Sequence, residues 1–297
     1  MMVVRTVAEL RAALRPHRTA QHSIALVPTM GALHEGHLSL IRHARAHDGV
    51  VAVSLFLNPS QFNERSDLER YPRNERRDAA LAEAAGADLL FAPSVEEVYP
   101  PGFATSVEVL GLTERFEGAA RGSEHFRGVT TVVTKLLCMA LPDVTYFGQK
   151  DAQQVVVIRR LVEDLNLPVR IEALPTVREP DGLAMSSRNA LLSAEERHRA
   201  LAIPAALDAA RERVIAGERA ASTLVEAGVA RLHASGIEPE YVSLVDPDTL
   251  EPIDTLTGAG LLVLAARVGH VRLIDNAVLV PQGAPNPRRP LPGKALA

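Results

Sequence analysis

The sequence predicts an α/β protein, with a doubly wound parallel sheet domain followed by a smaller α+β domain. Three observations carry this prediction. Short apolar segments alternate with amphipathic helical segments up to about residue 175. The segment 50–57 is apolar throughout, which is typical of a parallel strand covered on both faces. After Pro175 the alternation stops, and helical segments precede three strand-like ones.

The first domain is expected to alternate strands and helices along the chain. We expect strands at residues 24–27, 50–57, 88–91, 144–147 and 169–174, and helices at 37–47, 74–85, 129–140 and 152–166. In such a sheet, ligands bind at the carboxyl ends of the strands. The segments that directly follow the strands are therefore the candidate site.

The second domain is expected to contain helices at residues 193–216 and 221–235 and strands at 241–245, 261–266 and 271–280. The last two strands meet near Gly269, which predicts an antiparallel hairpin. We place the first domain at 1–176 and the second at 177–281. The tail at 282–297 holds several prolines and few apolar residues, so we expect it to be disordered.

The composition argues against several classes of function. A formal net charge of −4 over 297 residues disfavours a general nucleic-acid binder. The chain has no apolar run long enough to span a membrane and no signal-peptide layout at its start, so we expect a cytoplasmic location. One cysteine, Cys138, excludes an intramolecular disulfide. Arginine supplies most of the positive charge, so the three lysines, Lys135, Lys150 and Lys294, stand out.

The most informative motif is Pro-Thr-Met-Gly-Ala-Leu-His-Glu-Gly-His at residues 28–37, between the first strand and the first helix. A helix N-terminus after a glycine-bearing turn attracts anions, because free N–H groups and the helix dipole point to it. His34 and His37 at that position indicate a phosphate that reacts. The alternative is a loop whose histidines only cap the helix. Their spacing is not that of a zinc motif.

A second motif, Phe-Gly-Gln-Lys-Asp-Ala-Gln-Gln at 147–154, follows another strand. Lys150 can neutralise a triphosphate, Asp151 can cap the helix or bind a ribose hydroxyl, and Gln154 can face the same site. The alternative is an ordinary capped helix with an exposed lysine. In a third motif, Met185 to Asn189, hydroxyls and Arg188 suit a polyphosphate, unless the segment is only a polar linker.

A fourth motif, Asn-Pro-Ser-Gln-Phe at 58–62, ends the second strand and offers Gln61 to a small polar substrate. Tyr71 follows and is expected to cover the site. The segment His125 to Gly128 opens the helix expected at 129–140 and gives a further anion contact. The chain contains neither a G-x-x-x-x-G-K-[ST] nor a G-x-G-x-x-G motif, which disfavours a P-loop or a dinucleotide-binding protein.

In this order and spacing, the motifs resemble the pantothenate synthetase (pantoate–β-alanine ligase) family over nearly the whole chain. The resemblance implies a Rossmann-like first domain and an ATP-dependent ligase. Pantoate would attack the α-phosphorus of ATP to give pantoyl adenylate, and β-alanine would then displace AMP. It further implies Mg²⁺ bridging ATP oxygens and a cytoplasmic homodimer, with no nucleic-acid or membrane partner.

The resemblance also implies roles for individual residues. His34, His37 and Lys150 would be catalytic, with His37 as general acid. The nucleotide would be bound by Met30, Gly31, Ala32, Leu33, His34, Glu35, Gly36, His37, Gly148, Gln149, Lys150, Asp151, Val177, Met185, Ser186, Ser187 and Arg188. Pantoate and β-alanine would be bound by Gln61, Gln154, Met30, Asn58 and Tyr71. Asp78 matches a position tied to magnesium.

Two features depart from the family pattern. Gln149 stands where the family usually has glutamate, and the segment 121–125 is one residue longer than the usual Arg-Pro-Gly-His.

Two other functions are compatible with the motifs: an adenylyltransferase that leaves AMP on its product, and a nucleotide sensor without turnover. Free AMP and pantoate-dependent exchange of pyrophosphate into ATP would distinguish the ligase from both.

Overall fold

The computed structural model describes residues 1–63 and 65–284. The chain forms two compact units. The first consists of Met1–Glu179 and Ala184–Ser187, and the second consists of Pro180–Leu183 and the chain from Arg188 onward. No helix in the described part of the chain is both long enough and apolar enough to cross a membrane.

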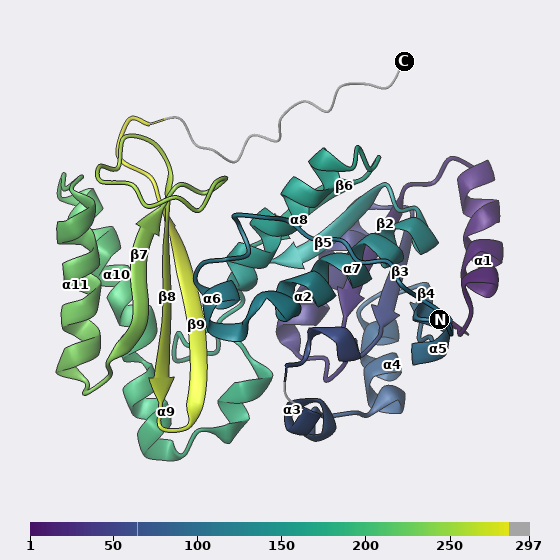
Figure 1. Cartoon of the computed structure of the whole chain (residues 1–297), viewed down its shortest axis with the longest axis horizontal. Coiled ribbons are helices and arrows are strands. Elements are labelled where there is room, and N and C mark those ends of the chain that lie inside the picture. The colour runs from purple at the N-terminus through teal and green to yellow at the C-terminus, as the bar shows by residue number, and fades with distance from the viewer. Residues whose placement is uncertain (64, 285–297) are drawn as a thin grey trace. The chain divides into compact units, whose positions relative to one another are not determined.

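The first unit contains a parallel six-stranded sheet in the order β1-β4-β3-β2-β5-β6 (Figure 1). Its strands are β1 (Met2–Val4), β2 (Ile24–Thr29), β3 (Val50–Leu55), β4 (Leu89–Phe91), β5 (Val144–Gly148) and β6 (Arg170–Leu174). The predicted parallel sheet is confirmed. Sequence analysis missed β1, a three-residue edge strand too short to show a pattern. Strand order reverses between β2 and β5, and ligands of open α/β sheets bind at the carboxyl ends of strands at such a reversal.

Two apolar cores lie against the two faces of this sheet. Along β2, Ile24 and Leu26 pack with one core, and Ala25 and Val27 pack with the other, because successive side chains of a strand point to opposite faces. Helices α1 (Val7–Thr19), α7 (Ser123–Ala140) and α8 (Ala152–Asp164) belong to the first core, and α2 (Glu35–His47) and α4 (Glu75–Ala84) belong to the second. The remaining elements are η1 (Pro59–Gln61), α3 (Arg65–Arg70), α5 (Val95–Val98), α6 (Glu117–Arg121) and η2 (Gln149–Asp151).

The helix expected at 129–140 begins six residues earlier, at Ser123. Gly122, with φ of +82°, forms the turn that starts it. The segment from His125 to Gly128 therefore lies inside the first turns of α7 and not ahead of them. Gly128 is needed there because a Cβ atom would overlap the carbonyl oxygen of Ser60. This close approach presses α7 against η1.

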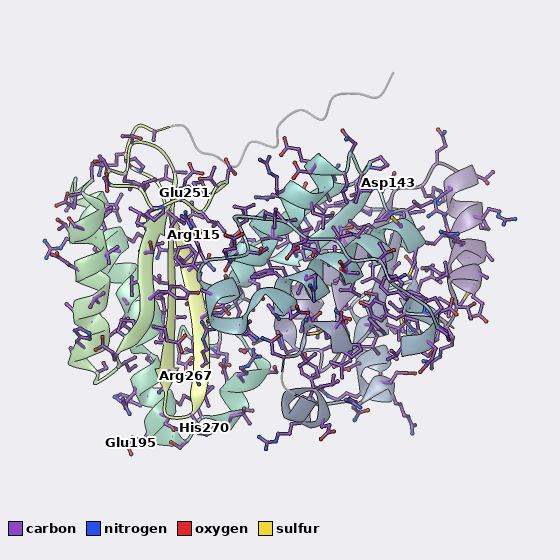
Figure 2. The ribbon with its side chains drawn as sticks, viewed as in Figure 1. Arg115, Asp143, Glu195, Glu251, Arg267 and His270 are labelled. Carbon is purple, nitrogen blue, oxygen red and sulfur yellow. The ribbon has the colours of Figure 1, made fainter. Side chains whose placement is uncertain are left out.

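The second unit contains α9 (Ala194–Ala200), α10 (Ala202–Ile215) and α11 (Ala221–Ala234) beside an antiparallel sheet in the order β7-β8-β9. The strands are β7 (Pro239–Val245), β8 (Gly260–Val268) and β9 (Val271–Leu279). The predicted hairpin is confirmed: Val268 pairs with Val271 around Gly269, whose φ is +60°. Arg267 and His270 flank this turn (Figure 2). Of the predicted tail, residues 285–297 lie outside the described residues.

Candidate active site

The loop from β2 to α2 is shaped by two residues with positive φ, Gly31 at +94° and Ala32 at +51°. A non-glycine residue in this conformation is uncommon and costs energy. The carboxylate of Asp78, on α4, compensates by accepting two N–H groups of the loop, that of Ala32 at 2.8 Å and that of Leu33 at 2.9 Å. Asp78 is 1% exposed, so these charge-assisted bonds form away from solvent. Asp78 thus fixes the loop that leads to the helix.

His34 and His37 lie together at the N-terminus of α2. Their ring centroids are 4.1 Å apart. His34 is the N-cap residue, and its Nδ1 accepts the Gly36 N–H at 3.1 Å. His37 Nδ1 accepts the His34 N–H at 3.4 Å. Because Nδ1 is the acceptor in both rings, each neutral ring carries its proton on Nε2. Sequence analysis weighed helix capping against phosphate chemistry, and the arrangement supplies capping through Nδ1 while keeping an Nε2–H donor on each ring.

Burial and positive charge keep both rings neutral. Burial, together with the charges of His34 and Lys150, lowers the pKa of His37 to about 3. Burial also lowers the pKa of His34, with a further contribution from Lys150. Asp151 and Glu179 oppose that shift at His34. These influences place Lys150, from the β5–α8 segment, in the electrostatic surroundings of both histidines, and Asp151 in those of His34.

The residues around the two histidines differ in burial and in the groups that they contact. Leu33 is fully buried in the core, so only its backbone can meet a ligand. Glu35 pairs with Arg42 on the outer side of α2. Gly36 is needed because a Cβ atom would lie 2.9 Å from Cε1 of His34. Lys150 is mostly buried, with a side chain 19% exposed, and its Nζ lies 3.9 Å from Asp151 Oδ1.

The contacts of the Asp78 carboxylate leave little room for it to ligate a magnesium ion. Both carboxylate oxygens already accept backbone N–H groups, and the side chain is buried. Among the described residues, no group of three histidine, cysteine or acidic side chains is arranged to hold a metal. These contacts favour a loop-positioning role for Asp78 over direct ligation of a metal.

Gln61 is fixed at both its backbone and its side chain. His125 Nδ1 lies 2.8 Å from the Gln61 carbonyl oxygen. Asn58 Nδ2 donates to Gln61 Oε1 at 3.0 Å. Burial lowers the pKa of His125 and Arg121 lowers it further, whereas the Gln61 backbone and the Glu117 and Asp151 carboxylates oppose the shift. The Asp151 carboxylate therefore lies within electrostatic range of both His34 and His125.

The side chain of Asn58 is buried and bonded within the protein, whereas the sequence suggested that it binds substrate directly. It is 1% exposed, and its amide is bonded to the Gly128 carbonyl, Ser60, Tyr99 and Gln61. Tyr71 packs edge-on against Phe62, with ring centroids 5.9 Å apart. Gln154 is half-buried in the first turn of α8, whereas the neighbouring Gln153 is buried and donates to the carbonyls of Leu112 and Arg115.

The third motif lies where the chain passes from one unit to the other. The Met185 N–H donates to the Val177 carbonyl at 2.9 Å, and Arg178 bridges to Ala184. Residues 184–187 thus belong to the first unit with Val177, whereas Arg188 belongs to the second. The part that Arg188 takes in the site stays a prediction.

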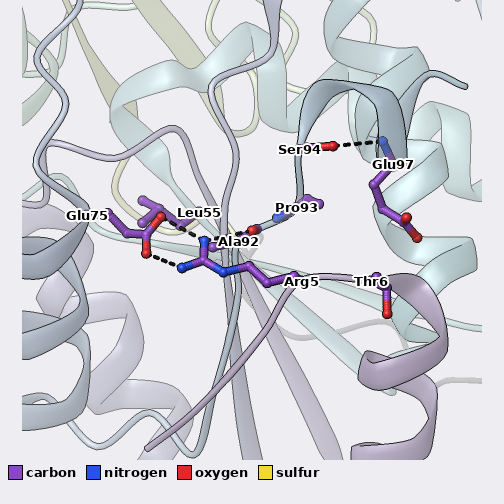
Figure 3. Close-up of a pocket in the computed structure, with 8 residues that line it drawn as sticks. All are labelled: Arg5, Thr6, Leu55, Glu75, Ala92, Pro93, Ser94 and Glu97. Atoms are coloured by element: carbon purple, nitrogen blue, oxygen red, sulfur yellow. Dashed lines mark hydrogen bonds and ion pairs between the residues drawn. The ribbon is translucent and has the colours of Figure 1, made fainter.

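A pocket of about 320 Å³ lies elsewhere on the first unit, lined by residues including Arg5, Leu55, Glu75 and Glu97 (Figure 3). The Arg5 guanidinium pairs with the Glu75 carboxylate and donates to the Ala92 carbonyl. The charge of Arg5 is therefore neutralised within the pocket. Its lining includes none of the predicted site residues.

Sequence reasoning missed the roles of two residues. The family resemblance implies a metal role for Asp78, whose carboxylate binds the loop backbone, and no sequence motif marks Tyr99. Tyr99 donates to Asn58 Oδ1 at 2.8 Å from a position 41 residues away. No local pattern marks either partner, because both contacts join segments that are distant in the sequence.

Known proteins resemble this chain in sequence and in fold. The family model for pantoate-beta-alanine ligase matches residues 2–278. The chain is 53% identical to pantothenate synthetase of Roseiflexus castenholzii, over 94% of this chain and 99% of that protein. It is similar to the crystal structure of pantothenate synthetase from Thermus thermophilus, with a TM-score of 0.87 and 47% identity over 93% of this chain and 99% of that one. It also matches a Francisella tularensis pantoate-beta-alanine ligase complexed with beta-gamma ATP and beta-alanine, with a TM-score of 0.76 and 33% identity over 94% and 97% of the two chains.

Proposed function

The chain belongs to the pantoate–β-alanine ligase family, and from this premise we propose how its own residues form pantothenate. The reaction is the ATP-dependent condensation of pantoate with β-alanine. A pantoate carboxylate oxygen attacks the α-phosphorus of ATP, and the bond to pyrophosphate breaks. The β-alanine amine then attacks the acyl carbon of the adenylate, and AMP leaves with the oxygen that joined it to the acyl group.

The pair of neutral imidazoles at the N-terminus of α2 carries the proposal. Negative charge develops on the phosphate oxygens during adenylation, and donors already aimed at that charge lower the barrier. The two Nε2–H groups supply such donors without reorganisation, because Nδ1 of each ring already accepts a backbone N–H. Lys150 adds a positive charge beside them. His37 acts first as a neutral donor, because its pKa of about 3 leaves no imidazolium at neutral pH in the free protein.

The remaining predicted residues complete the proposal. Residues 30–37, 148–151, Val177 and 185–188 bind ATP. Gln61 and Gln154 bind pantoate as neutral groups, which orient its carboxylate and hydroxyls without neutralising the nucleophile. Mg²⁺ bound together with ATP would neutralise part of the charge of its phosphates. We further propose that residues 177–281 form a lid domain and that the protein is a cytoplasmic homodimer.

Pyrophosphate exchange tests this function directly. Labelled pyrophosphate should enter ATP only when pantoate is present, and β-alanine should then yield free AMP and pantothenate. A His37→Ala variant should lower the exchange rate by about 10²–10³, the range seen when one transition-state donor is removed. A stable adenylylated product would indicate an adenylyltransferase, and nucleotide binding without exchange would indicate a sensor.

A further inference from the structure

The side-chain amide of Gln61 is held by a chain of hydrogen bonds that begins at Tyr99. The Tyr99 hydroxyl donates to Asn58 Oδ1 at 2.8 Å, and Asn58 Nδ2 donates to Gln61 Oε1 at 3.0 Å. Asn58 is 1% exposed, so water does not compete for these bonds. The orientation of the Asn58 amide therefore decides which end of the Gln61 amide it holds.

Two backbone groups fix the Asn58 amide without ambiguity. The Ser60 N–H lies 3.3 Å from one side-chain atom of Asn58, and the Gly128 carbonyl oxygen lies 3.1 Å from the other. A backbone N–H can only donate and a backbone carbonyl can only accept. The atom near Ser60 is therefore the oxygen, and the atom near Gly128 is the nitrogen.

The orientation of Gln61 follows from this assignment. The second hydrogen of Asn58 Nδ2 points to Gln61, so the Gln61 atom that it meets must be the acceptor, Oε1. The Nε2 group of Gln61 is then the end turned away from Asn58. Gln61 consequently presents two N–H donors, and not its oxygen, to whatever binds beside it.

Tyr99 is itself held rigidly. It follows α5, and its ring contacts Phe103 and Phe56, with centroids 5.1 Å and 6.2 Å apart. Lys135 Nζ lies 4.4 Å from the Phe103 centroid and 5.8 Å from that of Tyr99. Because aromatic packing sets the ring position, a Tyr99→Phe substitution removes the hydroxyl without removing the ring.

We propose that Tyr99 is a positioning residue for pantoate, acting through Asn58 to keep the Gln61 amide nitrogen toward the substrate. The inference rests on the proposed function, in which Gln61 binds pantoate. A carboxylate accepts hydrogen bonds and cannot donate them. A Gln61 amide turned by 180° would place its oxygen against the pantoate carboxylate and repel it. Tyr99 thus reinforces the Asn58 orientation that Ser60 and Gly128 also support, and through it favours a hydrogen-bond acceptor at this subsite.

Tyr99→Phe is the first test. Its pantoate KM in the exchange assay should rise about threefold to tenfold, the range expected for one hydrogen bond. Its ATP dissociation constant, measured without pantoate, should match that of the wild type. Tyr146→Phe is the matched control, because it also removes a tyrosine hydroxyl that donates to a side-chain oxygen, here Asp48 Oδ2 at 2.7 Å, and it should leave the pantoate KM unchanged.

A double-mutant cycle with Gln61→Ala separates positioning from general packing. If Tyr99 acts through Gln61, adding Tyr99→Phe to Gln61→Ala should produce no further rise in pantoate KM. An equal rise in both backgrounds, or a Tyr99→Phe variant with the wild-type KM, would overturn the inference.

Asn58→Asp provides a second route, since an ionised carboxylate cannot donate to Gln61 Oε1 and should raise the pantoate KM more than Tyr99→Phe does. A smaller rise would contradict the proposal. If the wild-type protein itself lacks pantoate-dependent exchange, the proposed function fails, and this inference fails with it. Wild-type exchange with an unaffected Tyr99→Phe variant refutes the inference alone.

Discussion

Replacing Asp78 by asparagine should damage both stability and catalysis through the loop that Asp78 holds. The carboxylate accepts the N–H groups of Ala32 and Leu33 at 2.8 Å and 2.9 Å. Asparagine keeps one acceptor oxygen but turns an NH₂ donor toward the other N–H, which loses one charge-assisted bond. A hydrogen bond to a charged group is worth about 1.5–3 kcal/mol, so we expect unfolding to be easier by about 2–3 kcal/mol.

Urea denaturation measures that loss, and pyrophosphate exchange measures its effect on chemistry. With the loop displaced, the donors of α2 no longer meet the α-phosphate in the best geometry, so we expect exchange to fall about tenfold to a hundredfold. Asp143→Asn is a matched control, since the Asp143 carboxylate also accepts a backbone N–H, that of Ile24 at 2.7 Å, at the amino end of β2. It should reduce stability and leave exchange unchanged.

Magnesium titration decides between the two roles of Asp78. A loop-positioning role predicts that Asp78→Asn exchange stays low at every magnesium concentration. The reasoning is refuted if the variant keeps wild-type stability and regains full exchange at high magnesium, because that result identifies Asp78 as a metal ligand.

Three further predictions concern other parts of the site. Gln154→Ala should weaken pantoate binding more than ATP binding in separate titrations, and equal weakening would contradict its role. Gly128→Ala drives a Cβ atom into the Ser60 carbonyl oxygen, so it should destabilise the protein by about 1–3 kcal/mol in urea and raise the pantoate KM by displacing η1. Because the pKa of His37 is about 3 when folded and about 6.5 when unfolded, its stabilising contribution is complete above pH 6.5 and is lost as the pH falls toward 3. Urea midpoints from pH 7 to pH 4 should therefore fall less steeply in His37→Gln than in the wild type, and identical slopes would refute this assignment.

The elements of the sheet could be predicted because their signals are local. The apolar runs at Ile24 to Val27 and in β3 identify buried strands within a few residues, and a glycine-bearing turn with two histidines marks the helix that follows. The polar partners could not be predicted in the same way. Asp78 lies 46 residues from Ala32, and His125 lies 64 residues from Gln61.

The predicted start of α7 at residue 129 is wrong because the first residues of the helix carry little apolar signal. Residues 123–128 are mostly polar, so their apolar pattern is weak, and α7 begins there from the turn at Gly122. The residue type of Asn58 suits a substrate contact. Asn58 is buried under α7, however, and its amide bonds to groups of the protein instead. Sequence patterns thus indicate a candidate site, while the contacts of its polar side chains with the scaffold become visible only in the tertiary structure.

The chain passes between the two compact units three times within ten residues, at 179–180, 183–184 and 187–188. A single cut at any of these junctions would separate a short peptide from the compact unit to which it belongs. A fragment ending at Glu179 would lose Ser186 and Ser187 together with the Met185 amide that bonds to Val177. Proteolytic nicking in this stretch should therefore inactivate nucleotide chemistry while both halves keep their cores, and attempts to express the halves separately should include residues 184–187 with the first.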